Sequence, residues 1–244
     1  MVAAVPLAYE ATGPENGEAV VLLHGFPMDR TMWRFQVSPL TQAGYRVILP
    51  DLRGHGRSPV AESSIPAMAQ DVVALLDRLR VGAAAVVGFS MGGYVALELA
   101  HAHPERVVAL ALVDTRAEPD SAEAREKRLA YIPEVQRDGP RILVDAMLGV
   151  MLTPDTLQNR RGLVDLVRSI MARQGVEGIC ETLRALADRP DQRPRLGGIR
   201  CPALVLAGEM DAVTPPASQE VLAGGIPDAE LVLLPRLAHG TPLE

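Results

Sequence analysis

Short apolar runs alternate along the chain with longer segments in which apolar residues recur every three or four positions. The runs are rich in valine, leucine and alanine and hold few charges, which is typical of strands buried on both faces of a parallel sheet. Six runs have this character: residues 19–23, 46–49, 83–87, 109–113, 203–207 and 230–234. We therefore expect each of them to form a buried strand.

Helical patterns lie between several of these runs. Residues 65–80 are one such segment, and residues 92–103, which run up to Pro104, are another. The alternation of strands and helices predicts an α/β fold with a mostly parallel central sheet and helices on both faces. In such sheets ligands bind beyond the carboxyl ends of the strands, so functional residues are expected in the loops that follow strands.

The alternation stops after Val113. Residues 115–195 are helical and charged in pattern, with helices expected near 122–136, 140–152, 154–173 and 176–188. Strand character returns only at residues 201–206. A helical insertion between two strands of one sheet is expected to cover the strand ends. We therefore predict a core made of residues 1–114 and 196–244 and a helical cap made of residues 115–195.

Composition narrows the class of function. Of 244 residues, 48% are apolar, which is enough for one large hydrophobic core. A net charge of −6 without a dense Lys/Arg cluster argues against nucleic acid and anionic membranes as partners. No apolar run approaches the roughly 20 residues that span a bilayer. The charge distribution thus points to a small molecule as the partner. The N-terminal segment lacks a basic stretch followed by a hydrophobic one, so we expect a cytoplasmic protein.

One serine lies in a glycine-rich turn. Residues 88–92 read Gly-Phe-Ser-Met-Gly, with a predicted strand before Ser90 and a predicted helix after it, which is the context of the G-x-S-x-G nucleophile motif. Gly88 and Gly92 leave room for a sharp, strained turn, and Gly93 lets the helix pack closely on the sheet. On this segment alone, an ordinary glycine-rich turn is an equally good interpretation.

A serine hydroxyl is a nucleophile at neutral pH only when a histidine accepts its proton and a carboxylate orients that histidine. The chain has five histidines: His24, His55, His101, His103 and His239. His239 follows the last predicted strand, where a reactive group is expected. His101 and His103 are two residues apart on a predicted helix, so they face different sides and are expected at the surface rather than at a metal site.

Two aspartates compete for the role of the carboxylate. Asp211 follows the strand predicted over residues 203–207, and Asp114 ends the strand predicted over residues 109–113. An ordinary turn aspartate before Pro215 is the alternative for Asp211. The order Ser90, Asp211, His239 is a known order of a catalytic triad, and we prefer Asp211 because its surroundings match the family motif described below.

Backbone amides complete such a site by binding the oxyanion. The candidates are the amide of Met91, directly after the serine, and that of Phe26, in the loop after the strand 19–23. His24 is expected to support this loop by hydrogen bonding. Residues 51–58 contain Gly-x-Gly, but the third glycine of a dinucleotide site is missing and Pro59 follows, so a charged structural loop is the better interpretation.

With these residues assigned, the sequence resembles the α/β-hydrolase family. The resemblance rests on five motifs in the family's order: HGFPMD, DLRGHGRS, GFSMGG, GEMDAVTP and the late histidine. Residues 24–33 and 114–121 are similar to a subgroup of small bacterial carboxylesterases. The resemblance implies hydrolysis of short-chain acyl esters through a Ser-His-Asp triad, with no cofactor and no metal. It also implies a last helix after the histidine, which residues 240–244 do not contain.

The same subgroup implies that the helical cap holds the alcohol or acyl side of the substrate. Trp33 and Met151 are the candidate substrate contacts, although methionines at helical spacing are more often core residues.

Several alternatives stay open at this point. A lactonase acting on enol-lactones or acyl-lactones, or a carbon–carbon bond hydrolase, would use the same three residues. Peroxide in place of water would give a perhydrolase side activity. A ligand receptor on a hydrolase scaffold, with slow turnover, is the alternative from another class. Ser90 argues against relatives with an aspartate nucleophile. Cys180 and Cys201 do not form a Cys-x-x-Cys pair and are expected to be free thiols.

Overall fold

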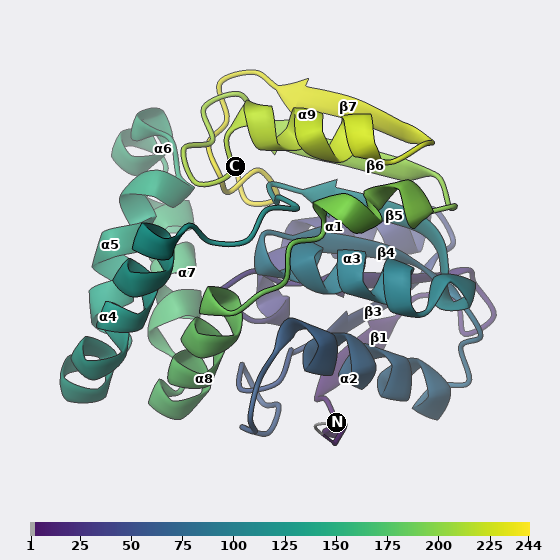
Figure 1. The fold of residues 1–244 in the computed structure, drawn as a ribbon, viewed down its shortest axis with the longest axis horizontal. Helices are drawn as coiled ribbons and strands as arrows, with labels where there is room; N and C mark the ends of the chain where they lie inside the picture. Colours follow the sequence, from purple (N-terminus) through teal and green to yellow (C-terminus); the bar gives the residue numbers. More distant parts are fainter. Residues whose placement is uncertain (1–2) are drawn as a thin grey trace.

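The computed structural model describes residues 3–244 and contains one seven-stranded sheet in the order β1-β3-β2-β4-β5-β6-β7 (Figure 1). Its strands are β1 (Tyr9–Thr12), β2 (Ala19–Leu23), β3 (Arg46–Pro50), β4 (Ala84–Phe89), β5 (Val107–Val113), β6 (Ala203–Gly208) and β7 (Ala229–Leu234). All neighbouring strands pair in parallel except β1, which runs antiparallel to β3. The predicted mostly parallel sheet is confirmed.

Alternation along the strands divides the apolar side chains into two layers, because successive residues point to opposite faces of a sheet. In β2, Val21 and Leu23 belong to one cluster of buried residues, and Val20 and Leu22 belong to the other. The helices of the sheet are α1 (Arg34–Gln42), α2 (Ile65–Arg78), α3 (Met91–Ala102) and α9 (Pro216–Gly225). The first cluster includes side chains of α2, α3 and α9, and α1 packs against the second. Helices therefore lie on both faces, as predicted.

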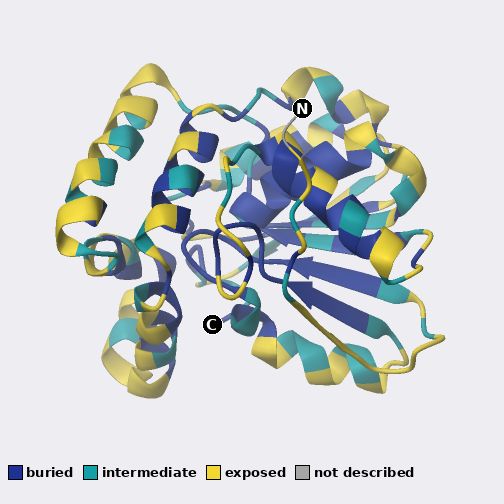
Figure 2. Cartoon of the chain, turned by 90° about the horizontal axis from the view of Figure 1, so that it is seen from below, coloured by how far each residue is buried: buried dark blue, intermediate teal, exposed yellow. Residues whose placement is uncertain are grey.

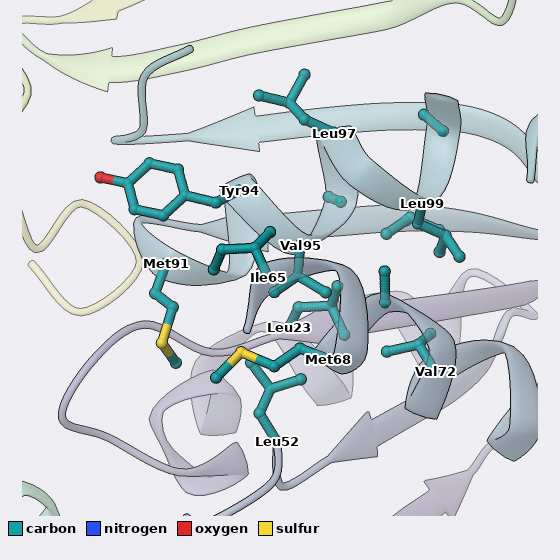
Figure 3. Packing of buried hydrophobic residues seen from close by; sticks show 14 of the residues in the cluster. Leu23, Leu52, Ile65, Met68, Val72, Met91, Tyr94, Val95, Leu97 and Leu99 are labelled. Atoms are coloured by element: carbon teal, nitrogen blue, oxygen red, sulfur yellow. The ribbon is translucent and has the colours of Figure 1, made fainter. Parts of the chain in front are cut away.

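The helix α2 illustrates how local signals and burial agree. Ser64 caps it by accepting a hydrogen bond from the amide of Ala67 at 3.2 Å, and Pro66 stands in the first turn, where no amide donor is needed. Its apolar stripe joins the first cluster, together with Leu52 and Met91 (Figure 3). This packing holds the start of α3 firmly against the sheet.

Five α-helices lie between β5 and β6 in the chain. They are α4 (Ala122–Asp138), α5 (Arg141–Met151), α6 (Pro154–Asn159), α7 (Arg161–Ala172) and α8 (Val176–Ala187). Figure 1 shows them gathered at one end of the sheet, and Figure 2 shows that they expose one side and bury the other. Side chains of α5 and α7 join the second cluster, so these helices share a hydrophobic core with the sheet. The predicted helical insertion is present, while the division into core and cap stays a prediction.

Three features differ from the sequence-based expectation. The prediction of a single helix over residues 154–173 is wrong. Arg160 has a non-helical backbone (φ −119°, ψ 57°) and separates α6 from α7. The edge strand β1 was not expected; all of its residues are exposed, so no apolar run marks it. Residues of β7 are mostly half-buried rather than buried on both faces, because it is the opposite edge.

Three short 3-10 helices complete the described chain: η1 (Arg30–Trp33), η2 (Pro104–Arg106) and η3 (Arg193–Gly198). None of the helices within residues 3–244 has the length and apolar character needed to cross a membrane.

Candidate active site

Ser90 stands in the turn between β4 and α3, with a left-handed backbone (φ 50°, ψ −113°) that is unusual for a residue with a side chain. Its amide donates to the carbonyl of Val113 at 2.9 Å, which fixes the turn to the neighbouring strand. The side chain is half-buried. A strained, well-anchored turn of this kind presents the hydroxyl at the carboxyl end of the sheet.

The glycines around Ser90 have no room for a side chain. A Cβ atom on Gly88 would lie 2.3 Å from the carbonyl oxygen of Gly92, and one on Gly92 would lie 2.2 Å from that of Leu23. On Gly93 it would lie 2.4 Å from Oγ1 of Thr115. The glycines therefore permit the close approach of α3 to the strand ends.

His239 lies directly beside Ser90, and Asp211 lies beside His239. The distance from Ser90 Oγ to His239 Nε2 is 3.0 Å, and that from His239 Nδ1 to Asp211 Oδ2 is 2.8 Å. Both His239 and Asp211 are buried. Because an ionised carboxylate can only accept, the proton of the neutral ring lies on Nδ1, and Nε2 is free to accept the hydroxyl proton of Ser90.

The hydrogen-bond partners of Asp211 stabilise its ionised form. Its Oδ1 accepts hydrogen bonds from the amides of Val213 (2.8 Å) and Thr214 (2.9 Å), and Oδ2 accepts from the hydroxyl of Thr214 at 2.6 Å. Burial alone would raise the pKa of Asp211, but the hydrogen bonds from His239 and Thr214 and the charge of His239 outweigh it and lower the pKa. The carboxylate therefore carries its charge where a histidine cation would form.

The loop after β2 lies against the Ser90 turn. A Cβ atom on Gly25 would lie 2.6 Å from the Phe89 ring and 3.2 Å from Cβ of Ser90, so this loop can approach only because residue 25 is glycine. Phe26 follows directly and is joined to Pro27 by a cis peptide bond. Met91 is the first residue of α3, so no preceding helical turn uses its amide, and its side chain is buried in the first cluster (Figure 3).

His24 supports this loop, as expected from the sequence. Its Nε2 accepts from the amide of Leu52 at 2.9 Å, which leaves Nδ1–H to donate to the carbonyl of Gly25 at 3.0 Å. Burial lowers the pKa of His24, so the ring is neutral and links the loop after β2 to the loop after β3. The ring of His55 lies 5.2 Å from that of His24.

Residues 51–58 form a charged structural loop. Asp51 is buried and accepts from the amides of Arg30 (3.0 Å) and Arg57 (2.9 Å), and it also pairs with the guanidinium of Arg30. Arg53 is buried and pairs with Asp71 of α2 at 2.6 Å. These contacts tie the end of β3 to its neighbours, in agreement with the structural interpretation of this loop.

Trp33 and Met151 both belong to the second cluster of buried residues. The ring of Trp33 packs edge-on against Phe89 at 6.5 Å between centroids, and Phe89 in turn lies 5.2 Å from His239. The carbonyl of Met151 accepts from the amide of Gly240 at 2.7 Å. Met151 therefore lies next to the histidine loop, while Trp33 lies behind Phe89; substrate contact by either residue stays a prediction.

A polar network behind these residues escaped the sequence analysis. Thr115 donates its hydroxyl to the carbonyl of Ser90 at 2.7 Å. Gln219 of α9 is buried and donates to the carbonyls of Thr115 (2.8 Å) and Thr214 (2.9 Å). Only the tertiary fold brings these segments together, and a glutamine in a short helix gives no signal in the sequence.

Asp114, the rival candidate for the acid, has different partners. Its carboxylate accepts hydrogen bonds from the amide of Gly208 and from Thr241, and the carboxylate beside His239 Nδ1 is that of Asp211. Within residues 3–244, no group of three His, Cys, Asp or Glu side chains is arranged to hold a metal ion. Cys180 and Cys201 are both free.

Comparisons with known proteins identify the family. Residues 18–145 match the family described as alpha/beta hydrolase fold. The chain is 36% identical over 96% of its length to RutD of Variovorax paradoxus, named as a carbamate hydrolase, and covers 90% of that protein. A thermophilic esterase from Thermogutta terrifontis superposes with a TM-score of 0.93 at 39% identity, covering 98% of this chain and 88% of its own.

An enol-lactonase from Burkholderia xenovorans LB400 superposes with a TM-score of 0.91 at 31% identity, covering 98% of this chain and 92% of its own. These relatives are all named as hydrolytic enzymes, but their names give different substrates: a carbamate, an ester and an enol-lactone. The chain thus belongs to the α/β-hydrolase fold family and is a hydrolase of that family.

Proposed function

We propose that this hydrolase cleaves carboxylic esters, with short-chain acyl esters as the preferred class, through a covalent acyl-enzyme on Ser90. The observation that carries the proposal is the chain of hydrogen bonds from the half-buried Ser90 through the buried His239 to the buried Asp211. Nucleophile, base and orienting carboxylate are then all within hydrogen-bond reach, which is the arrangement that activates a serine.

In the first half of the reaction, Ser90 Oγ attacks the carbonyl carbon while its proton passes to Nε2 of His239. Asp211 stabilises the resulting imidazolium at Nδ1. The amides of Phe26 and Met91 bind the developing oxyanion, and the start of α3 adds favourable helix-dipole charge. The proton on Nε2 then passes to the alkoxide oxygen as the carbon–oxygen bond breaks, and the alcohol leaves.

In the second half, water attacks the acyl-enzyme. His239 accepts a proton from the water, the oxyanion forms again, and the proton passes to Ser90 Oγ as the bond to the acyl carbon breaks. The carboxylic acid is released and the serine regains its hydroxyl. No redox step occurs, and the chain's own residues carry every proton transfer.

The helices α4–α8 are proposed to act as a cap, residues 115–195, over a core made of residues 1–114 and 196–244. Support comes from their place at the carboxyl ends of the strands and from the apolar second cluster, to which Trp33 and Met151 belong. Phe26 is buried and belongs to the first cluster.

A lactonase is the second candidate, because an enol-lactonase is among the structures most similar to the chain. A lactone is a cyclic ester, so the same steps open its ring and the leaving oxygen stays attached to the acyl group. A panel that pairs each lactone with the open-chain ester of the same acid separates the two activities. A carbamate in the same panel tests the activity for which RutD is named. A vinylogous diketone tests for carbon–carbon bond hydrolysis.

The experiment that tests the proposal is replacement of the nucleophile. We expect Ser90→Ala to lower kcat for a short-chain nitrophenyl ester by at least about 10³-fold, with an unchanged circular dichroism spectrum. Ser169→Ala, an exposed serine on α7, is the matched control and should stay within about twofold of the wild type. Turnover by Ser90→Ala at a rate close to that of the wild type would contradict the proposal.

A ligand receptor on the same scaffold is distinguished by stoichiometry. Labelling of Ser90 by an organophosphonate reports an activated serine, whereas multiple rapid turnovers of an acyl ester report an enzyme. Labelling without more than one slow turnover on any member of the panel would favour the receptor.

A further inference from the structure

Asp114 is a buried carboxylate that the proposed chemistry does not use. It follows β5, is fully buried, and has a left-handed backbone (φ 44°), which costs free energy for a residue with a side chain. Its amide donates to the carbonyl of Leu206 at 2.9 Å, so the strained residue is fixed to β6. Strain of this kind persists where the surrounding structure needs the side chain in one place.

The two oxygens of Asp114 bind two different loops. Oδ1 accepts from the amide of Gly208 at 3.0 Å, at the end of β6 and three residues before Asp211. Oδ2 accepts from the amide of Thr241 at 3.2 Å and from its hydroxyl at 2.5 Å, two residues after His239. One carboxylate therefore joins the segment that carries Asp211 to the segment that carries His239, although these segments follow different strands.

Other hydrogen bonds also hold the histidine loop. The amide of Gly240 donates to the carbonyl of Met151 at 2.7 Å, and that of Ala238 donates to Oε2 of Glu244 at 3.1 Å. The carbonyl of Leu237 accepts from the amide of Met210, in the loop after β6, at 2.9 Å, and that of Pro242 accepts from Gln36 of α1 at 2.8 Å. Asp114 differs from these anchors because its side chain binds the end of β6 and the segment after His239 at once.

The two aspartates also differ in acidity. Burial raises the pKa of Asp114 well above its ordinary value, and the nearby charge of Asp211 raises it further, against the hydrogen bonds from Thr241 and Gly208. The pKa of Asp211 is lowered instead. Two carboxyls with opposite shifts serve different roles, and the negative charge at His239 is that of Asp211.

We propose that Asp114 is a positioning residue that sets the place of His239 relative to Asp211 and Ser90 by holding Thr241 and Gly208 with the two oxygens of one carboxyl group. The proposal rests on the proposed function. A positioning residue acts on the geometry of proton transfer and not on substrate binding, so its loss lowers kcat and leaves KM nearly unchanged.

The test compares Asp114→Asn, Thr241→Val and Thr241→Ser. Asparagine has one acceptor oxygen in its side chain where aspartate has two, and valine in place of Thr241 lacks the hydroxyl. Each of these variants should therefore lower kcat by about 10- to 100-fold at nearly constant KM. Thr241→Ser keeps the hydroxyl and should recover most of the activity. The double variant Asp114→Asn/Thr241→Val should be about as impaired as the worse single variant, because both remove the same contact.

Two further measurements keep the test decisive. Urea unfolding checks that each variant is folded; if Asp114→Asn is not, the comparison of Thr241→Val with Thr241→Ser carries the test, because Thr241 is partly exposed. The rate of organophosphonate labelling of Ser90 should fall with kcat. Folded variants that keep wild-type kcat and labelling would overturn the positioning role alone, whereas a wild type that is neither labelled nor active would overturn the proposed function.

Discussion

At the scale of single residues, burial decides which side chains can be charged. His55 is buried, its Nδ1–H donates to the carbonyl of Arg53 at 3.1 Å, and its Nε2 has no partner within the described residues. Burial, with the neighbouring ring of His24, lowers the pKa of His55 to about 3. A histidine of this kind must lose its proton before the protein folds.

We predict that folding becomes less favourable in mild acid. Between the unfolded pKa of about 6.5 and the folded value, the unfolded chain binds the proton and the native protein does not, so stability falls as pH falls. At about 1.4 kcal/mol per unit, His55 contributes a loss on the order of 2 kcal/mol from about pH 7 to about pH 5. Urea unfolding at the two pH values measures it.

The matched variant is His55→Asn, whose amide can still donate to the carbonyl of Arg53 but does not titrate. Its stability should change less with pH than that of the wild type, although His24, whose pKa is also lowered by burial, still contributes. Equal pH dependence in the two proteins would show that His55 is charged in the native state or exposed to water.

At the scale of elements, one glutamine joins the inserted helices to the core. Gln174 follows α7 and is buried; its Oε1 accepts from the amide of Gly56 at 3.0 Å, and its Nε2 donates to Asp29 Oδ2 at 3.0 Å and to the carbonyl of Ile170 at 2.8 Å. Arg173 adds two hydrogen bonds to Asp29 at 2.7 Å. The loops after β2 and β3 are thereby fixed to α7.

We predict that Gln174→Met destabilises the protein by about 1–3 kcal/mol, because the buried carboxylate of Asp29 loses a hydrogen-bond donor while the volume of the side chain is kept. Arg168→Met, at an exposed position of α7, is the control and should change stability by no more than about 0.5 kcal/mol. Urea unfolding measures both. A Gln174→Met protein as stable as the control would mean that water replaces the glutamine.

At the scale of the whole molecule, the second cluster crosses from the sheet to the inserted helices. It contains Val20 and Leu22 of β2, Trp33 of η1, and Val167 and Met171 of α7. The sheet and the inserted helices share this hydrophobic core, so separating them would expose apolar surface on both. We therefore expect them to unfold together.

We predict a single unfolding transition. Trp33 is the one tryptophan of the chain and is buried in the shared cluster, so its fluorescence reports the junction between sheet and inserted helices. Far-UV circular dichroism reports all the helices. The two signals should change together in urea, within the error of the midpoints. A fluorescence change at lower urea would mean that the inserted helices detach first.

The sequence by itself determined the parallel sheet and the order of the candidate residues. Apolar runs identified six of the seven strands, because buried strands need apolar side chains on both faces. The glycines of residues 88–93 predicted the sharp turn at Ser90, since close approach excludes a Cβ atom. The edge strand β1 was missed because exposed residues pair through their backbone and carry no apolar pattern.

Only the tertiary structure decided which carboxylate faces His239 and what the other one holds. Asp114 and Asp211 both follow strands, so spacing along the chain cannot separate them. The parallel register of β5 and β6 brings Gly208 to Oδ1 of Asp114 and leaves Asp211 beside His239. Such contacts join residues far apart in sequence, and their partners are set by packing, which local patterns do not encode.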